Sequence, residues 1–407
     1  MRSGKFYWDL KIEETKAFFN NRPGWMSVYD NDFPSAAFIK GLINEYKPEN
    51  LFEAGTAAGW AAYYMLEEAH KYKDNAVLTS VDFADRVYYD AEKQIGAAFY
   101  EKAPELRKFW DLKTNLLVAD YVSGCDKKFD FVFIDASHLH PWAALDLLAI
   151  LPCLEKNAVI VLHDVFLNKI AAGKMSAGRH PEQVVCGKEK YFGPNRIYEV
   201  FEDKMTLSYD DVAPNCAAIE LEQLSFDKIS EALDSPWEPE ILNYTSHENF
   251  IEIFNKIKTG IELFAGKKQS DTFLAIANNR LAQVERKVAE RMQNAADFIN
   301  KTSKNKKTIF WGASKFLGSI LEQNRLETAD VLGIVDKNPA LQGKKICGLT
   351  VFSPKMLSEL KPQQIFSTVV TTPDMKSKII NILQNEGIFE DFEIIDDLFE
   401  CFQNFED

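Results

Sequence analysis

The chain has 407 residues, a length that suits two or three domains better than a single core. Its composition, 46% hydrophobic and 27% charged, is that of an ordinary globular protein, and its formal net charge of -14 argues against general binding to nucleic acid or anionic membranes. No apolar run is long enough to span a membrane, and the polar N-terminus does not resemble a secretory signal, so we expect a cytoplasmic location.

The first 49 residues are rich in aromatic side chains, and their apolar positions recur at helical spacing. This pattern predicts a helical flank or lid before the first strand. Residues 51–59, with the sequence LFEAGTAAG, then predict a strand, a tight turn and the start of a helix over residues 60–70.

The turn at residues 55–59, here called the glycine turn, is suited to ligand binding. Its small residues Gly55, Ala57 and Gly59 would let the backbone approach a ligand closely. A helix that begins there would direct backbone N–H groups and the positive end of its dipole at the ligand, and Glu53 adds a carboxylate just before the turn.

Strands and helices alternate from here to residue 165, which predicts a parallel, doubly wound sheet with helical crossovers at about 58–71, 88–109 and 141–152. Each expected strand ends in an acidic residue, at the edge where open α/β sheets bind ligands. The four later strands are expected at Ala76–Val81, Leu116–Ala119, Phe131–Ile134 and Val159–Leu162, and they lead into Asp82, Asp120, Asp135 and the pair His163-Asp164.

An insertion over residues 166–196 follows, and then a short helix at Arg196–Phe201. Two further runs, Met205–Ser208 and Cys216–Leu221, are expected to close the same sheet at seven strands. The prolines Pro236 and Pro239 mark an exit from this domain.

One long helix is expected over residues 271–300, with apolar positions that approximate a 3-4 repeat. Two interpretations stay open, a connector packed on its own chain and the seam of a homodimer. The last hundred residues repeat the strand–turn–helix pattern around Gly312, which predicts a smaller Rossmann-like α/β domain with or without a nucleotide. We therefore expect a first domain at residues 1–240, a helical connector at 241–304 and a second domain at 305–407.

The glycine turn and the acid Asp82, about 25 residues beyond it, resemble the cofactor site of class I S-adenosylmethionine-dependent methyltransferases. In that family the turn passes beside the methionine part of the cofactor, and the acid after the second strand accepts hydrogen bonds from the ribose hydroxyls. A dinucleotide dehydrogenase also has an acid there, but this turn lacks the G-x-G-x-x-G spacing that holds a pyrophosphate. The resemblance assigns the cofactor to Glu53, Gly55, Thr56, Ala57, Gly59, Asp82, Phe83, Asp120 and Asp135.

The stretch FDFVFIDASHLHPW, continued by AVIVLHDV, is similar to the metal-dependent O-methyltransferase branch that contains catechol and macrocin-type enzymes. The resemblance implies that Asp135, His163 and Asp164 bind a divalent metal, Mg²⁺ or Mn²⁺. It also implies that His138 is the general base, with His140 as the alternative. A metal-bound hydroxyl is easier to ionise, and a nearby histidine can take its proton. The first position of the metal pair is usually acidic, so His163 departs from the family and leaves the metal open; hydrogen bonding to nearby backbone is the other interpretation of His163.

The insertion carries more basic than acidic residues: Lys169, Lys174, Arg179, Lys188, Lys190 and Arg196 against Glu182 and Glu189. They would suit the phosphates of a nucleotide-linked sugar, or they form a solvated loop. The C-terminal domain is similar to segments appended to bacterial sugar methyltransferases, which favours a sugar hydroxyl, free or in a glycan, as acceptor. The alternatives are a hydroxylase, an N- or C-methyltransferase, or a non-catalytic protein that binds nucleotide sugars.

Overall fold

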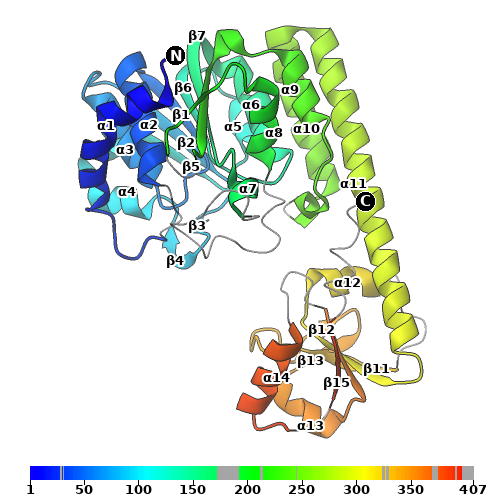
Figure 1. Cartoon of the computed structure of the whole chain (residues 1–407). Helices are drawn as coiled ribbons and strands as arrows, with labels where there is room; N and C mark the ends of the chain where they lie inside the picture. The colour runs from blue at the N-terminus through cyan, green and yellow to red at the C-terminus, as the bar shows by residue number, and fades with distance from the viewer. Residues whose placement is uncertain are drawn as a thin grey trace. The chain divides into compact units, whose positions relative to one another are not determined.

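The computed structural model describes residues 1–27, 30, 32–171, 192–210, 214–243, 245–322, 326, 330–368, 375–389 and 392–396. Two compact units make up the chain, Met1–Val284 and Glu285–Asp407, and the boundary between them falls inside helix α11 (Lys267–Thr302). Each unit has its own sheet (Figure 1). The finer division at residues 240 and 304 stays a prediction.

The first unit contains the expected seven-stranded, mostly parallel sheet, in the order β5-β2-β1-β6-β7-β9-β8. The pairs among β5, β2, β1, β6 and β7 are parallel, and β9 runs antiparallel to both β7 and β8. The strands are β1 (Asn50–Ala54), β2 (Val77–Asp82), β5 (Trp110–Thr114), β6 (Phe129–Ile134), β7 (Leu154–His163), β8 (Thr206–Leu207) and β9 (Cys216–Glu220).

The register of this sheet brings the ends of four strands together. Ala54 lies beside both Val81 and Ile134, and Ile134 lies beside Leu162. The chain order reverses between β1 and β6, and ligands bind at such a reversal in open α/β sheets. The residues that follow β1, β2, β6 and β7 are therefore neighbours at one edge.

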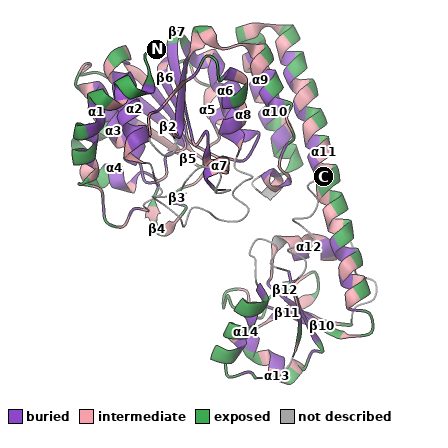
Figure 2. Cartoon of the chain, viewed as in Figure 1, coloured by how far each residue is buried: buried purple, intermediate pink, exposed green. Residues whose placement is uncertain are grey.

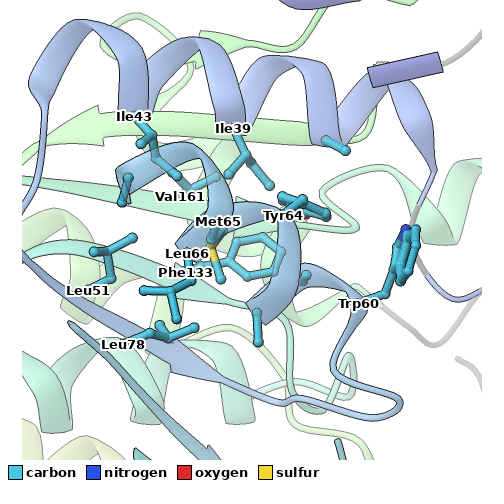
Figure 3. Close-up of a cluster of buried hydrophobic side chains, with 14 of the residues drawn as sticks. Ile39, Ile43, Leu51, Trp60, Tyr64, Met65, Leu66, Leu78, Phe133 and Val161 are labelled. Carbon is cyan, nitrogen blue, oxygen red and sulfur yellow. The ribbon is translucent and has the colours of Figure 1, made fainter. Parts of the chain in front are cut away.

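One face of the sheet is covered by α1 (Gly4–Phe19), α2 (Phe33–Tyr46) and α3 (Trp60–His70), whose inner sides are buried (Figure 2). Side chains of α2 and α3 pack on Leu51, Leu78 and Phe133 of three adjacent strands (Figure 3). The N-terminal segment, expected as a flank or lid, is thus a layer of the core. The other helices of the unit are α4 (Ala97–Lys102), α5 (Val118–Val122), α6 (Trp142–Ile150), α7 (Leu167–Ala171), α8 (Gly193–Phe201), α9 (Phe226–Leu233) and α10 (His247–Ala265).

The prediction of a strand at 116–119 was wrong. The third parallel strand is β5, and Asp120 lies in the first turn of α5, where its carboxylate accepts a hydrogen bond from Leu117 N at 3.2 Å. A four-residue apolar run does not distinguish a strand from a helix start, and β5 is only partly apolar.

The helix expected at 88–109 was also wrong. This segment contains a hairpin of β3 (Arg86–Val87) and β4 (Asp90–Gln94), then α4 and a 3₁₀ helix (Pro104–Phe109). Gly96 has a φ of 82° and begins α4, so the helical spacing is not continuous through it.

The second unit is the expected smaller α/β domain. Its six-stranded sheet has the order β12-β13-β11-β10-β14-β15. The strands are β10 (Lys307–Trp311), β11 (Asp330–Val335), β12 (Lys345–Ile346), β13 (Leu349–Phe352), β14 (Gln364–Ser367) and β15 (Glu393–Ile395), and the helices are α12 (Lys315–Glu322), α13 (Leu357–Leu360) and α14 (Met375–Asn385).

Helix α11 has 36 residues and carries the apolar repeat that suggested a dimer seam. Ala277, Leu281 and Val284 of this repeat are already buried in the single chain, and Ala295 lies in the core of the second unit. These positions are therefore covered without a second copy. Within the described residues, no helix has the length and hydropathy that a membrane crossing needs.

Candidate active site

Two aspartates and two histidines meet where β6 and β7 end. His163 Nδ1 lies 3.0 Å from Asp135 Oδ1, and His138 Nε2 lies 3.0 Å from Asp164 Oδ2 and 3.4 Å from Asp135 Oδ1. Asp164 has a left-handed backbone, with a φ of 57°, which turns the chain just after the strand. The four residues that sequence reasoning selected for metal binding and proton transfer thus form one cluster, here called the Asp-His cluster.

Charges within the Asp-His cluster support one another. Burial acts to raise the pKa of Asp135 and Asp164, but the charge of His163 and hydrogen bonds from both histidines hold these pKa values below their ordinary range. Burial acts to lower the pKa of His138, but the two carboxylates raise it to about 9. They likewise hold the pKa of His163 well above its usual value. At neutral pH the cluster alone therefore carries two negative and two positive charges.

The geometry distinguishes the two histidines. Among the described residues, Asp135, His138 and Asp164 offer ligand atoms that all lie within 4.8 Å of one another. His163 Nδ1 lies 3.0 Å from Asp135 Oδ1 and 3.5 Å from Asp164 Oδ1, and its buried Nε2 has no hydrogen-bond partner among the described residues. The geometric trio shares both aspartates with the predicted metal set but contains His138 in place of His163, and both assignments stay predictions.

Two groups beside the cluster were missed by sequence reasoning. Asn215, just before β9, donates a hydrogen bond from Nδ2 to Asp164 Oδ1 and accepts one from Phe166 N at 3.2 Å. Asp32 caps α2 by accepting a hydrogen bond from Ser35 N at 2.6 Å, and its carboxyl lies in the field of His163. Both come from segments far away in sequence, and neither stands in a motif that would single it out.

Several backbone N–H groups of the glycine turn itself donate to groups of the chain. Thr56 N and Ala57 N donate to Asp82 Oδ2 at 2.9 and 3.1 Å, and Gly59 N donates to Thr56 O at 2.8 Å. Asp82 Oδ1 accepts a further hydrogen bond from Ala84 N at 2.8 Å. The carboxylate of Asp82 therefore holds the turn.

Gly55 joins this turn to the Asp-His cluster. Its φ is +85°, and a Cβ atom on it would lie 2.2 Å from the carbonyl oxygen of Asp135. Since real Cβ atoms do not approach so closely, only glycine permits this contact between β1 and β6.

Glu53 is fully buried below the glycine turn. Thr56 Oγ1 donates to its Oε2 at 3.0 Å, while its Oε1 is buried with no hydrogen-bond partner in the described part of the chain. Burial raises the pKa of Glu53 to about 8, so the carboxyl is largely protonated at neutral pH.

Replacing Glu53 with glutamine is expected to make stability less dependent on pH. The folded wild type keeps a proton that the unfolded chain releases above the ordinary carboxyl pKa, so wild-type stability falls as the pH rises towards about 8. In the wild type this loss of stability amounts to about 1.4 kcal/mol per unit of difference between the folded and unfolded pKa of Glu53. Glutamine does not titrate and has no such loss. The Tm of Glu53→Gln relative to wild type should therefore be higher at about pH 8 than at about pH 5 in thermal unfolding. Equal Tm differences at both pH values would contradict the raised pKa.

The remaining predicted residues lie in different surroundings. Phe83 follows Asp82 and is 55% exposed. Asp120 pairs with Lys256 of α10 at 2.8 Å. His140 contacts Ser235 Oγ at 3.1 Å, and burial lowers its pKa to about 3, so it has neither the position nor the partners of His138.

Of the basic residues in the insertion, two are described. Lys169 lies over the ring of Phe166, and Arg196 pairs with Glu199 at 2.9 Å. Lys174, Arg179, Lys188 and Lys190 lie outside the described residues.

Residues 52–165 match a family model described as a methyltransferase domain. This segment is therefore similar to methyltransferase domains. It contains the glycine turn, Asp82 and all four residues of the Asp-His cluster. The predicted class of protein is thereby confirmed, and the sheet described above is the fold expected for it.

Solved structures of methyltransferases are similar to about half of this chain. The O-methyltransferase TomG from Streptomyces achromogenes, in complex with SAM, is 14% identical, with 53% of this chain and 89% of that chain covered and a TM-score of 0.35. An O-methyltransferase from Bacillus cereus, in complex with SAH, is 17% identical, with 53% and 96% covered and a TM-score of 0.35. No curated protein matches the chain.

Proposed function

We propose that this protein is an S-adenosylmethionine-dependent, metal-assisted O-methyltransferase that acts on a sugar hydroxyl. The observation that carries the proposal is the position of the Asp-His cluster: it lies in the segment similar to methyltransferase domains, beside the glycine turn, at the edge where the sheet order reverses. A transferable methyl group and an acceptor hydroxyl would meet at this edge.

The donors of the cluster fit a divalent metal. Asp135, Asp164 and the predicted His163 supply two carboxylates and one imidazole, a set that suits Mn²⁺ or Fe²⁺ as well as Mg²⁺. When bound, such a cation lowers the pKa of an acceptor hydroxyl. Asn215 orients Asp164 through its hydrogen bond, and orienting partners of this kind keep a metal-binding carboxylate in place.

His138 is the proposed proton acceptor. With the aspartates unneutralised its pKa is about 9, so it already holds a proton at neutral pH. It can take a proton from the acceptor only when another positive charge offsets Asp135 and Asp164. In the alternative assignment, His138 coordinates the metal together with Asp135 and Asp164. His163 is then the histidine that accepts the proton.

The cofactor supplies a methyl group already activated on a sulfonium, so the chain mainly has to hold the reactants in line. The proposed contacts are those of the family resemblance: Glu53, Gly55, Thr56, Ala57, Gly59, Asp82, Phe83 and Asp135. Asp120 has the least support, because it is paired with Lys256.

The second unit supports a glycan or nucleotide-sugar acceptor only through its likeness to domains of sugar methyltransferases. N- or C-methylation, hydroxylation and non-catalytic binding are the competing functions. The cytoplasmic location stays a prediction.

The test is incubation of the full chain with S-adenosylmethionine, a panel of nucleotide sugars and Mn²⁺, Mg²⁺ or EDTA, followed by mass spectrometry. We expect the acceptor to gain the mass of one methyl group at oxygen, and EDTA to abolish the gain. SAH should raise the Tm, because a ligand at 100 times its Kd adds about 2.7 kcal/mol to stability. No shift with SAH would favour the non-catalytic reading, and transfer that is unaffected by EDTA would remove the metal.

A further inference from the structure

The hairpin of β3 and β4 carries a solvent-exposed aromatic side chain that the proposed chemistry does not yet use. Tyr88 stands in its turn and is 73% exposed, the largest exposure of an aromatic residue in the described part of the first unit. Tyr89 beside it is partly buried and contacts the Tyr88 ring edge-on at 4.8 Å. An exposed aromatic ring held by a neighbouring ring presents an apolar face to solvent.

The hairpin is fastened to the glycine turn. After β4, Gly96 N donates to Ala57 O and Ala98 N donates to Ala58 O, each at 2.9 Å. On the other side of the hairpin, Tyr89 OH donates to Asp30 Oδ2 at 2.7 Å. These bonds fix where Tyr88 stands relative to the turn.

Tyr88 also lies near the reacting end of the site. Figure 1 shows β3 and β4 at the end of the first unit where the parallel strands end, together with α7, which follows Asp164. Gly55 of the glycine turn contacts the backbone of Asp135, so the bonds that fasten the hairpin to this turn also keep it close to the Asp-His cluster.

We propose that Tyr88 binds the acceptor, with its ring stacked on the apolar face of a sugar ring whose hydroxyl points to the Asp-His cluster. This inference rests on the proposed function and names the residue that selects the acceptor. The ring provides flat apolar area, and a sugar offers C–H groups on one face and hydroxyls at its edge. Phe83 lies in the same segment after β2 but directly follows Asp82, and its proposed role is to contact the cofactor.

The experiment compares Tyr88→Ala, Tyr88→Phe and wild type in methyl transfer to UDP-glucose, methyl β-galactoside and catechol. We expect Tyr88→Ala to raise KM for the sugar that wild type methylates by about tenfold, the equivalent of one aromatic contact, while kcat changes less than about twofold. Tyr88→Phe keeps the ring and should stay within about twofold of wild type in KM. The Kd for SAH, measured by calorimetry, should be unchanged in both variants.

Phe389→Ala is the matched control, because Phe389 is 81% exposed and lies in the second unit. It should leave KM and the Kd for SAH unchanged. An unaltered KM in Tyr88→Ala, or an equal rise in Tyr88→Phe, overturns the role of the ring, and faster transfer to catechol than to either sugar overturns the sugar. Absence of any transfer by wild type is a different result: it contradicts the proposed function, and the acceptor role of Tyr88 with it.

Discussion

Asp164→Asn is expected to lower kcat for methyl transfer by about 10²- to 10³-fold, the loss typical when one preorganised charged group is removed from an active site. Asp164 supplies one of the two carboxylates of the Asp-His cluster and lies 3.0 Å from His138. The amide keeps the size of the side chain but removes its charge, so both metal affinity and the pKa of His138 should fall. Steady-state kinetics at several Mn²⁺ concentrations measure the effect.

The fold of this variant should be intact. Asparagine tolerates the left-handed backbone of Asp164 better than most residues, and its carbonyl can still accept the hydrogen bond from Asn215. The Kd for SAH should therefore stay close to that of wild type. Asp9→Asn, at an exposed position of α1 that pairs with Lys5, is the control and should transfer methyl groups normally. Full activity of Asp164→Asn would remove this carboxylate from the mechanism.

Gly55→Ala is expected to unfold or severely weaken the first unit. The new Cβ would lie 2.2 Å from Asp135 O and 2.6 Å from Ala136 Cα, and both are backbone atoms. A left-handed alanine costs about 1–2 kcal/mol and forced displacement of packed atoms about 1–3 kcal/mol more. Denaturant unfolding should show this combined loss, and SAH binding should be abolished because Asp135 is displaced.

Gly348→Ala is the matched control for backbone strain. Gly348 has a φ of +86°, nearly that of Gly55, but a Cβ on it would meet no atom within 4 Å. This variant should lose only the free energy of unfolding that a left-handed alanine costs, and it should bind SAH normally. If the two variants lost equal stability, close contact with Asp135 would not explain the glycine at position 55.

The sequence was sufficient to predict the parallel core of the first unit. The strand, turn and helix from residue 50 to 70 are confirmed, because a buried apolar run, small turn residues and a helical repeat follow one another without ambiguity. Parallel strands end at a common edge, so acids after β6 and β7 had to be neighbours, and they are. The histidine spacing placed His138 in the same cluster.

Other parts depended on contacts that one sequence does not reveal. The partly apolar strand β5 was missed because the run after it is more apolar, and Asp120 was predicted to follow a strand as a result. The hairpin with Tyr88 is held by Gly96, Asp30 and the glycine turn rather than by its own pattern. Asn215 reaches Asp164 from 51 residues away.

The acids after the strands also have a structural explanation that the motif did not suggest. In the second unit, Asp336 Oδ2 accepts a hydrogen bond from Ala313 N at 2.8 Å, and its Oδ1 accepts one from Asn338 N at 2.8 Å. Asp82 makes the corresponding bonds to Thr56 and Ala84 in the first unit. Because both units use an acid to fasten the turn after the preceding strand, such an acid is not by itself evidence for a ribose.

The fastening of the glycine turn affects the thermodynamics of ligand capture. The backbone amides that donate to Asp82 are already fixed in position before any ligand binds. A ligand that binds there does not have to order a flexible segment, so little of its binding free energy is lost as conformational entropy of the protein. Preorganisation of this kind favours rapid lock-and-key association over slow induced fit.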